Sequence, residues 1–348
     1  AYSSLEHVGL ICVAVGIDSP LAVLGALLHM GYHALTKSTL FFAAGNVHQQ
    51  FHALDFRRLG GGLGRSMPTT ALALGLAGAA VCGLPPFGLF VSELTVLAGG
   101  FTSIACCPNT DPPIDSQGTV EYIKQKAARA DNCNVYAIAC VSKNREGKEL
   151  AEIGQLVEAG AVGISDDGAP VYSPELLRRA FEYCLMFGIP VMNHPEILEL
   201  TQNGVMHEGV TQLVLGLGGI PAAAEDVMVS RDVALAEATR GRLHVMHVSS
   251  GGSIHIIRRA KKRGVRVTTE VTPHHFTLTD ECLRTFDSNY KMNPPLRGPG
   301  HVQACIEGLQ DGTIDCIVTD HAPHAKEKKM QELDQAPFGV VGLETALG

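Results

Sequence analysis

The sequence predicts an α/β fold: a (β/α)8 barrel preceded by an all-α hydrophobic segment of the membrane type. Two observations predict it. The first hundred of the 348 residues carry only four basic and four acidic side chains, and they contain long uncharged runs. From residue 101 onward, short apolar runs alternate with helical patterns. Long uncharged runs are typical of membrane helices, and strand–helix alternation is typical of a parallel sheet.

Two uncharged runs near the start are long enough to cross a membrane. One has 18 residues between Asp18 and Lys37, and the other has 27 between Arg65 and Glu93. About 20 apolar residues in a helix span the hydrocarbon layer. The loop from Asp55 to Arg65 holds three of the four basic residues, which favours a cytoplasmic position for it. We therefore expect residues 1–97 to be a membrane-helix segment; the alternative is a hydrophobic hairpin inside a soluble core.

Seven apolar runs, each followed by a helical pattern, predict seven parallel strands. Their near-continuous hydrophobicity and the length of each unit, about 25 to 50 residues, favour a closed barrel over an open sheet. The runs are FTSIACC at 101–107, VYAIACV at 135–141, AVGIS at 161–165, IPVMN at 189–193, LHVMHV at 243–248, VRVTTEV at 265–271 and IDCIVT at 314–319.

Metal-binding residue types cluster at the carboxyl ends of these runs, where barrels of this kind carry their active sites. Imidazoles and carboxylates without thiolates suit a hydrolytic zinc site with open positions. The residues concerned are Asp166, Asp167, His194, His244, His247, His274, His275, Asp320, His321 and His324.

Charge and cysteine content narrow the class of protein. The net charge is −8, and it arises entirely after the first hundred residues. An acidic chain is a poor partner for nucleic acid, because binding phosphates requires a basic surface. Ten cysteines without a CxxC pair indicate reduced, mostly buried thiols and a cytoplasmic barrel.

Five motifs identify a family resemblance that runs from about residue 98 to residue 348. They are PNT at 108–110, SDDG at 165–168, NYKMNPPLR at 289–297, TDHAPH at 319–324 and APFGVVGLET at 336–345. This part of the chain resembles dihydroorotases of the amidohydrolase superfamily. The resemblance implies zinc-dependent, reversible hydrolysis of a small molecule, dihydroorotate, to N-carbamoyl-L-aspartate in pyrimidine biosynthesis, with two zinc ions per site in the intact family.

The resemblance also implies roles for single residues. Asp167 matches the aspartate that bridges the two zinc ions, where hydantoinases and many allantoinases use a carboxylated lysine. His194 and His247 match the ligands of the second ion. Asp320 matches a ligand of the first ion that is also the general base. The residues that match substrate-binding groups are Asn109, Asn293 and His324.

Two neighbouring residues receive structural interpretations instead. Asp166 is expected to cap a loop, because adjacent residues at a strand exit point apart. His244 lies three positions before His247, so we expect it on the opposite strand face, packed between strand and helix.

One family motif is absent, since no His-x-His occurs anywhere in the sequence. The resemblance therefore implies an incomplete barrel, strands 2 to 8, in which at most the second zinc site is well preserved and activity is impaired. The alternatives are another cyclic amidohydrolase acting on allantoin or hydantoin, or a catalytically silent barrel fused to a proton-channel fragment. The sequence leaves open whether the chain forms a homo-oligomer.

The first 97 residues carry a second resemblance. AYSSLEHVGL at 1–10, HALTKSTLFFAAGNV at 33–47 and GLPPFGLFVSE at 83–93 resemble antiporter-like membrane subunits of group 4 hydrogenases and respiratory complex I. This implies that Lys37 is a proton-relay lysine, with His33 one turn earlier; the alternative is a lysine that snorkels near a helix end. We therefore hypothesise a chimera of segments 1–97 and 98–348.

Overall fold

The structure is a computed structural model. It describes residues 103–130 and 133–343, together with residues 67–73 and scattered positions between Met30 and Gln49. The chain divides into two compact units. The first comprises residues 1–103, 131–134 and 347, and the second comprises the rest.

The described residues of the first unit are largely helical. Residues 42–44, 46–47 and 68–73 are all in helix. Among the residues that the structure describes, no helix is both long and apolar enough to cross a bilayer. Most of the two predicted spans lies outside the described residues, and so do His33 and Lys37.

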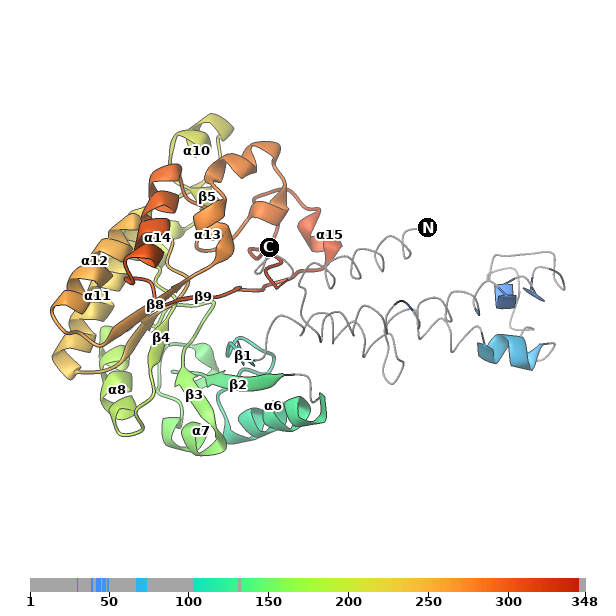
Figure 1. Cartoon of the computed structure of the whole chain (residues 1–348), viewed down its shortest axis with the longest axis horizontal. Helices are drawn as coiled ribbons and strands as arrows, with labels where there is room; N and C mark the ends of the chain where they lie inside the picture. Colours follow the sequence, from blue (N-terminus) through green and yellow to red (C-terminus); the bar gives the residue numbers. More distant parts are fainter. Residues whose placement is uncertain are drawn as a thin grey trace. The chain divides into compact units, whose positions relative to one another are not determined.

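The second unit is built on a curled, seven-stranded sheet, seen in Figure 1. All seven predicted strands are present, which confirms that part of the prediction. The strands, in sheet order, are β1 (Ser103–Cys106), β2 (Asn134–Ala139), β3 (Ala161–Ile164), β4 (Val191–Asn193), β7 (Leu243–Val245), β8 (Val267–Val271) and β9 (Cys316–Ile317). The register places Ile164 opposite Val191, and Val191 opposite Leu243, in parallel pairs. Within the described residues the sheet is a half-barrel that ends at β1 and β9.

Helices alternate with these strands, as the sequence predicted. They are α6 (Gln117–Ala130), α7 (Ile153–Ala159), α8 (Pro174–Leu185), α9 (Leu198–Thr201), α10 (Val210–Leu215), α11 (Ala222–Thr239), α12 (Gly251–Lys262), α13 (Pro273–Thr277), α14 (Pro299–Gln310) and α15 (Lys326–Lys329). Three short 3₁₀ helices are η2 (Lys143–Arg145), η3 (Asp280–Thr285) and η4 (Ser288–Tyr290).

Serine caps fix the starts of two core helices. The Ser173 side chain accepts a hydrogen bond from the backbone N–H of Leu176, and Pro174 occupies the first helical position of α8. Ser250 caps α12 in the same way through the N–H of Gly252. Such caps satisfy N–H groups that the helix itself cannot bond.

The hydrophobic core lies between the sheet and helices α8, α11 and α12. Leu243 and Val245 of β7 point into it with Phe181 of α8 and Ile254 of α12, all at most 2% exposed. Successive strand residues point to opposite faces. His244 therefore faces away from this core, toward the inner side of the curl.

A second, two-stranded parallel sheet was not predicted. It pairs β5 (Met206–His207) with β6 (Gly219–Ile220). Two residues per strand are too few for a periodic pattern, so the sequence carries no signal for it.

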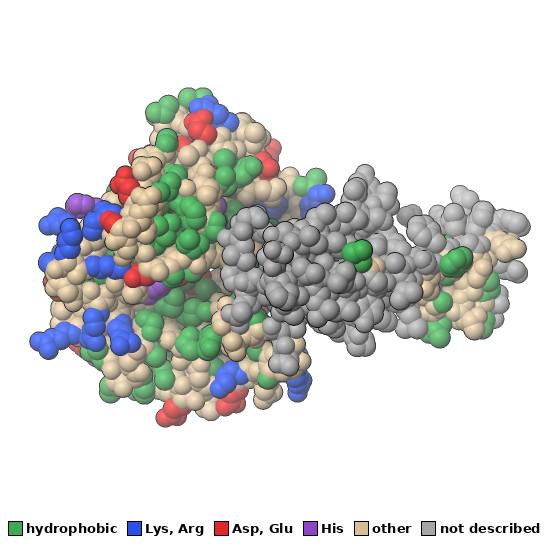
Figure 2. All heavy atoms as spheres, viewed as in Figure 1, with side chains coloured by type: hydrophobic (Ala, Val, Ile, Leu, Met, Phe, Trp, Pro, Cys, Tyr) green, Lys and Arg blue, Asp and Glu red, His purple; other side chains and the backbone are tan. Residues whose placement is uncertain are grey.

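Figure 2 shows Lys and Arg side chains near α11 and α12, with acidic side chains elsewhere on the same face. Helix α12 ends in Arg259, Lys261 and Lys262.

All eight cysteines among the described residues are free, as predicted, but only Cys140, Cys184 and Cys305 are buried. The expectation of mostly buried thiols was therefore wrong for this part of the chain.

Candidate metal centre

Three neighbouring strands each position one side chain of a type that can bind a metal ion. Asp167 follows β3, His194 follows β4 and His247 follows β7, and these strands are adjacent in the sheet. Because parallel strands end at the same edge, their exit loops converge. Asp167, His194 and His247 are 6%, 3% and 2% exposed.

The donor atoms of this triad are spaced for one small cation. Nδ1 of His194 lies 3.0 Å from Nε2 of His247. Oδ1 of Asp167 lies 3.9 Å from the first nitrogen and 3.5 Å from the second. Ligand atoms around a tetrahedral zinc ion are about 3.3–3.6 Å apart, given bond lengths of about 2.0–2.2 Å. Two imidazoles and a carboxylate thus fit zinc in donor type and spacing.

Opposite charges hold the triad together in the metal-free protein. Burial on its own would raise the pKa of Asp167, but the hydrogen bond and charge of His247 and the charge of His194 hold it well below its usual range. Burial would lower the pKa of His247, yet the hydrogen bond that it donates to Asp167 and the charges of Asp320, Asp167 and Glu270 raise it to about 9. A metal ion would therefore displace a proton from His247 on binding.

Asp320 approaches the triad from the end of β9. Its pKa is raised, mainly because the carboxyl is buried; the charge of His247 opposes this effect. Asp320 and His247 both adopt left-handed backbone conformations, with φ of 45° and 31°. Left-handed backbone costs a non-glycine residue of the order of 1 kcal/mol or more and recurs at functional sites.

One cavity of about 450 Å³ brings the predicted site residues of the barrel together. Its walls include all seven residues that the sequence singled out for metal or substrate, and six of the remaining lining residues come from the 321–339 segment or from Met292. The seven are Asn109, Asp167, His194, His247, Asn293, Asp320 and His324. Nε2 of His324 is 2.7 Å from the carbonyl oxygen of Phe338, which also lines the cavity.

The two aspartates of the SDDG motif make different contacts. Asp166 accepts hydrogen bonds from the backbone N–H groups of Val141 and Ser142, at 2.9 and 3.1 Å, and contacts the Ser142 hydroxyl at 2.5 Å. The prediction that Asp166 caps a loop is confirmed. Gly168 has φ of 81°, and a Cβ there would lie 3.0 Å from Nη2 of Arg145, so glycine suits both the backbone conformation and this close approach.

Arg145 was missed by the sequence analysis. Its guanidinium donates hydrogen bonds to the carbonyl oxygens of Asp166, at 3.2 Å, and Asp167. It thereby fixes the loop that presents the Asp167 carboxylate. No motif or strand end marks Arg145 in the sequence.

The prediction that His244 packs between strand and helix is wrong. Its Nδ1 lies 2.8 Å from the Thr268 hydroxyl and its Nε2 lies 2.9 Å from Glu270, both on β8. The ring is therefore not packed between strand and helix. It lies on the inner face of the sheet, in a polar group that also reaches His247, because Glu270 accepts from the His247 backbone N–H at 3.4 Å.

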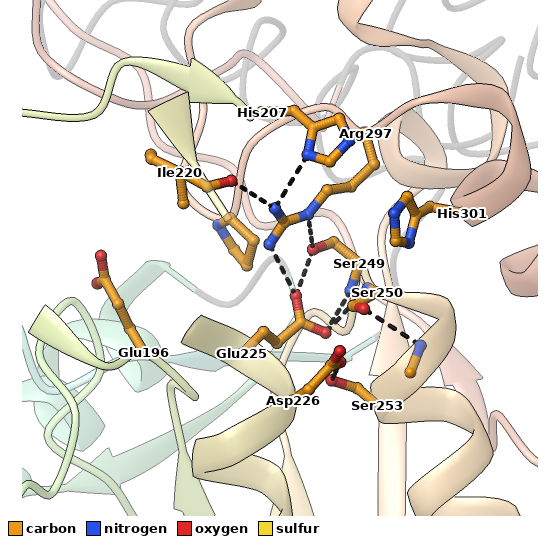
Figure 3. A network of polar contacts seen from close by, with 12 residues as sticks. Glu196, His207, Ile220, Glu225, Asp226, Ser249, Ser250, Ser253, Arg297 and His301 are labelled. Atoms are coloured by element: carbon orange, nitrogen blue, oxygen red, sulfur yellow. Dashed lines mark hydrogen bonds and ion pairs between the residues drawn. The ribbon is translucent and has the colours of Figure 1, made fainter. Parts of the chain in front are cut away.

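A buried polar network supports the loops behind the cavity (Figure 3). Arg297 and Glu225, each 2% exposed, form an ion pair of 3.4 Å. Glu225 also accepts from the backbone N–H groups of Ser249 and Ser250 at 3.1 and 2.9 Å, just after His247 in the sequence. Arg297 donates to the carbonyl oxygen of Ile220 in β6 at 2.9 Å and to the Ser249 hydroxyl at 3.0 Å.

Comparison with protein families gives two matches to different parts of the chain. Residues 1–106 match the model described as NADH:quinone oxidoreductase/Mrp antiporter, TM. Residues 89–253 match the model described as dihydro-orotase-like. Both resemblances identified in the sequence are thus confirmed.

Curated relatives match the second part closely. The dihydroorotase of Pelotomaculum thermopropionicum is 55% identical over 260 residues, which are 75% of this chain and 61% of that protein. The dihydroorotase of Endomicrobium trichonymphae is 49% identical over 259 residues, or 74% and 61%. The chain thus spans about 61% of the length of these relatives.

Solved structures share the fold. The L-hydantoinase of Arthrobacter aurescens aligns with a TM-score of 0.61 and 24% identity over 72% of this chain and 58% of that one. The dihydroorotase of Saccharomyces cerevisiae in complex with 5-fluoroorotic acid aligns with a TM-score of 0.58 and 19% identity, covering 77% and 72%. At this identity the likeness concerns the fold alone.

Proposed function

We propose that the barrel unit is a zinc-dependent dihydroorotase that hydrolyses dihydroorotate reversibly to N-carbamoyl-L-aspartate, in the cytoplasm. The observation that carries the proposal is the single cavity lined by the seven residues assigned from the motifs. The curated relatives named dihydroorotase support the reaction class. Aspartate at position 167, where hydantoinases use a carboxylated lysine, favours dihydroorotate over hydantoin.

The barrel is proposed to correspond to strands 2 to 8 of a (β/α)8 barrel and to hold one zinc ion. Asp167, His194 and His247 would supply the ligand atoms, and Asp320 stands nearby. When bound, zinc lowers the pKa of water and polarises a carbonyl group. The sequence holds no His-x-His for a second ion, so we expect turnover to be impaired.

Asp320 is the proposed general base. Its carboxylate would accept the proton of the attacking water while the water oxygen bonds to the ring amide carbon. The carbon–nitrogen bond then breaks, and Asp320 passes the proton to the departing nitrogen. Ring closure is the reverse of these steps.

Three further side chains are proposed to hold the substrate. The amides of Asn109 and Asn293 can donate to a carboxylate or a ring carbonyl. His324 uses Nε2–H to donate to the Phe338 carbonyl oxygen, so its Nδ1 is the atom that can accept a ring N–H.

A side-by-side assay of the zinc-loaded chain with dihydroorotate, hydantoin and allantoin tests this function. We expect dihydroorotate to react fastest, and Asp320→Asn to lower its turnover by about 10² to 10⁴-fold. Preference for hydantoin or allantoin would favour the other cyclic amidohydrolases. Zinc bound without turnover of any ring would indicate a catalytically silent barrel.

We also propose that segments 1–97 and 98–348 derive from different proteins. The two family matches, which meet and overlap at residues 89–106, support this proposal. The first segment would then be a membrane-helix fragment with Lys37 as its proton relay. Sequencing the source DNA across codons 89–106 tests the join; one uninterrupted native gene would contradict it.

A further inference from the structure

Glu196 contacts a candidate metal ligand and a candidate substrate-binding residue at once. It follows His194 by two positions, in the loop after β4. Its Oε2 lies 3.2 Å from Nε2 of His194 and accepts a 3.0 Å hydrogen bond from Nδ2 of Asn293. The Glu196 side chain is 13% exposed.

The charge state of Glu196 makes it an acceptor only. A glutamate carboxyl is ordinarily ionised at neutral pH, and Oε2 of Glu196 here faces two nitrogen atoms, Nε2 of His194 and Nδ2 of Asn293. An ionised carboxylate offers lone pairs and no hydrogen.

This acceptor fixes the tautomer of His194. Because Glu196 can only accept, the hydrogen of the neutral His194 ring belongs on Nε2. Nδ1 then keeps its lone pair, and Nδ1 is the atom that lies 3.0 Å from His247 and 3.9 Å from Asp167. The same carboxylate orients Asn293 by holding its Nδ2, so the carboxamide oxygen and nitrogen are not interchangeable.

His247 has no comparable support. Its Nδ1 is buried and has no hydrogen-bond partner among the described residues. A carboxylate contact on the outer nitrogen of a metal-ligating histidine orients the ring and raises its basicity. In this centre Glu196 makes that contact for one histidine of the two.

We propose that Glu196 is a positioning residue that sets the tautomer of His194 and the orientation of Asn293 together, and so links zinc affinity to substrate placement. The inference rests on the proposed metal centre. Loss of such a contact weakens metal binding by about 10- to 100-fold.

Two measurements on the full chain test the role of Glu196. Competition with a chromophoric chelator should show zinc binding weakened about 10- to 100-fold in Glu196→Gln. Nitrogen NMR of zinc-free protein labelled at histidine should show His194 with its hydrogen on Nε2, and a shift toward the Nδ1–H tautomer in Glu196→Gln. A purely structural role would leave this tautomer unchanged.

Two variants are the controls. Glu199→Gln alters an exposed carboxylate of α9 that bonds Tyr172, so zinc affinity and the His194 tautomer should match the parent. Asn293→Ala removes the second donor and should keep the Nε2–H tautomer. Parental affinity and tautomer in Glu196→Gln would overturn the inference, and so would a tautomer shift in Asn293→Ala.

The NMR measurement needs no zinc. If the parent chain bound no zinc but Glu196→Gln still shifted the His194 tautomer, the proposed metal centre would fail while Glu196 would still be shown to control the ring. If the parent and Glu196→Gln bound zinc with equal affinity, the proposed metal centre would stand and the proposed role of Glu196 in zinc affinity would fail. The two failures are therefore distinguishable.

Discussion

At the scale of single residues, His275 shows how hydrogen-bond partners fix a protonation state. The ring is 2% exposed, with Nδ1 2.7 Å from the Thr272 hydroxyl and Nε2 2.9 Å from the carbonyl oxygen of Pro294. A carbonyl only accepts, so Nε2 carries the hydrogen and Nδ1 accepts from Thr272. Burial, together with the charges of His247 and Arg297, lowers the pKa of His275 to about 3, although the hydrogen bond to Pro294 acts to raise it.

This pKa predicts an acid-dependent loss of stability. An exposed histidine has a pKa of about 6.5, so the unfolded chain binds the proton first as pH falls. The stabilisation that neutral His275 gives to the folded chain is therefore fully present above pH about 6.5 and is lost as the pH falls from about 6.5 to 3. At pH 5 the loss amounts to about 2 kcal/mol.

Urea unfolding at pH 7.5 and pH 5 measures this effect. Between these values, the free energy of unfolding of His275→Gln should fall by about 2 kcal/mol less than that of the parent. Glutamine retains a donor for Pro294 and does not titrate. His255→Gln changes an exposed histidine and should behave like the parent. Identical losses in His275→Gln and the parent would rule out this role.

Residue identities at strand exits were predictable, whereas their partners were not. Asp167 and His194 follow apolar runs and His247 lies near the end of one, so periodicity and motif spacing find them. Glu196 and Arg145 act through side-chain contacts across different loops, which no local pattern encodes. His244 was assigned to the wrong strand face, because the alternation was extended to His247, which lies beyond the end of β7 in a left-handed conformation.

At the scale of elements, the Glu225–Arg297 pair ties together five parts of the barrel unit. It joins α11, β6, the β5 residue His207, the loop after β7 and the NYKMNPPLR motif. The pair is fully enclosed, and its remaining polar atoms find partners. Removing one member of such a pair leaves the other charge buried and unpaired.

Arg297→Met should therefore lower the free energy of unfolding by about 3–5 kcal/mol. Urea unfolding followed by circular dichroism measures the change. The matched control is Arg263→Met, which removes an exposed ion pair with Glu237 and should leave the midpoint unchanged. A midpoint for Arg297→Met equal to that of Arg263→Met would mean that the network does not hold the loops.

The strands illustrate what sequence patterns resolve at this scale. All seven strands of the large sheet were predictable, because each lies wholly or almost wholly within an apolar run of at least five residues. The β5–β6 pair was not, since it lies in no such run and depends on neighbours such as Gly218, where a Cβ would meet the carbonyl oxygen of Asn203 at 2.0 Å.

At the scale of the whole molecule, the donor set predicts metal content. The described residues contain one group of three clustered ligands, Asp167, His194 and His247. We expect one zinc ion per chain, measured by mass spectrometry of the metal in protein dialysed against a zinc buffer. Asp167→Asn and His247→Ala should each abolish this ion, and Lys326→Met, in the exposed helix α15, should not. Two ions per chain would contradict the single centre.

The left-handed conformations at His247 and Asp320 have a consequence for stability. Such a conformation costs a non-glycine residue free energy, whereas glycine adopts it without strain. Glycine at either position would relieve this strain but would remove the imidazole or the carboxylate from the cavity. Local backbone stability and the chemistry of the cavity therefore favour different residues at these two positions.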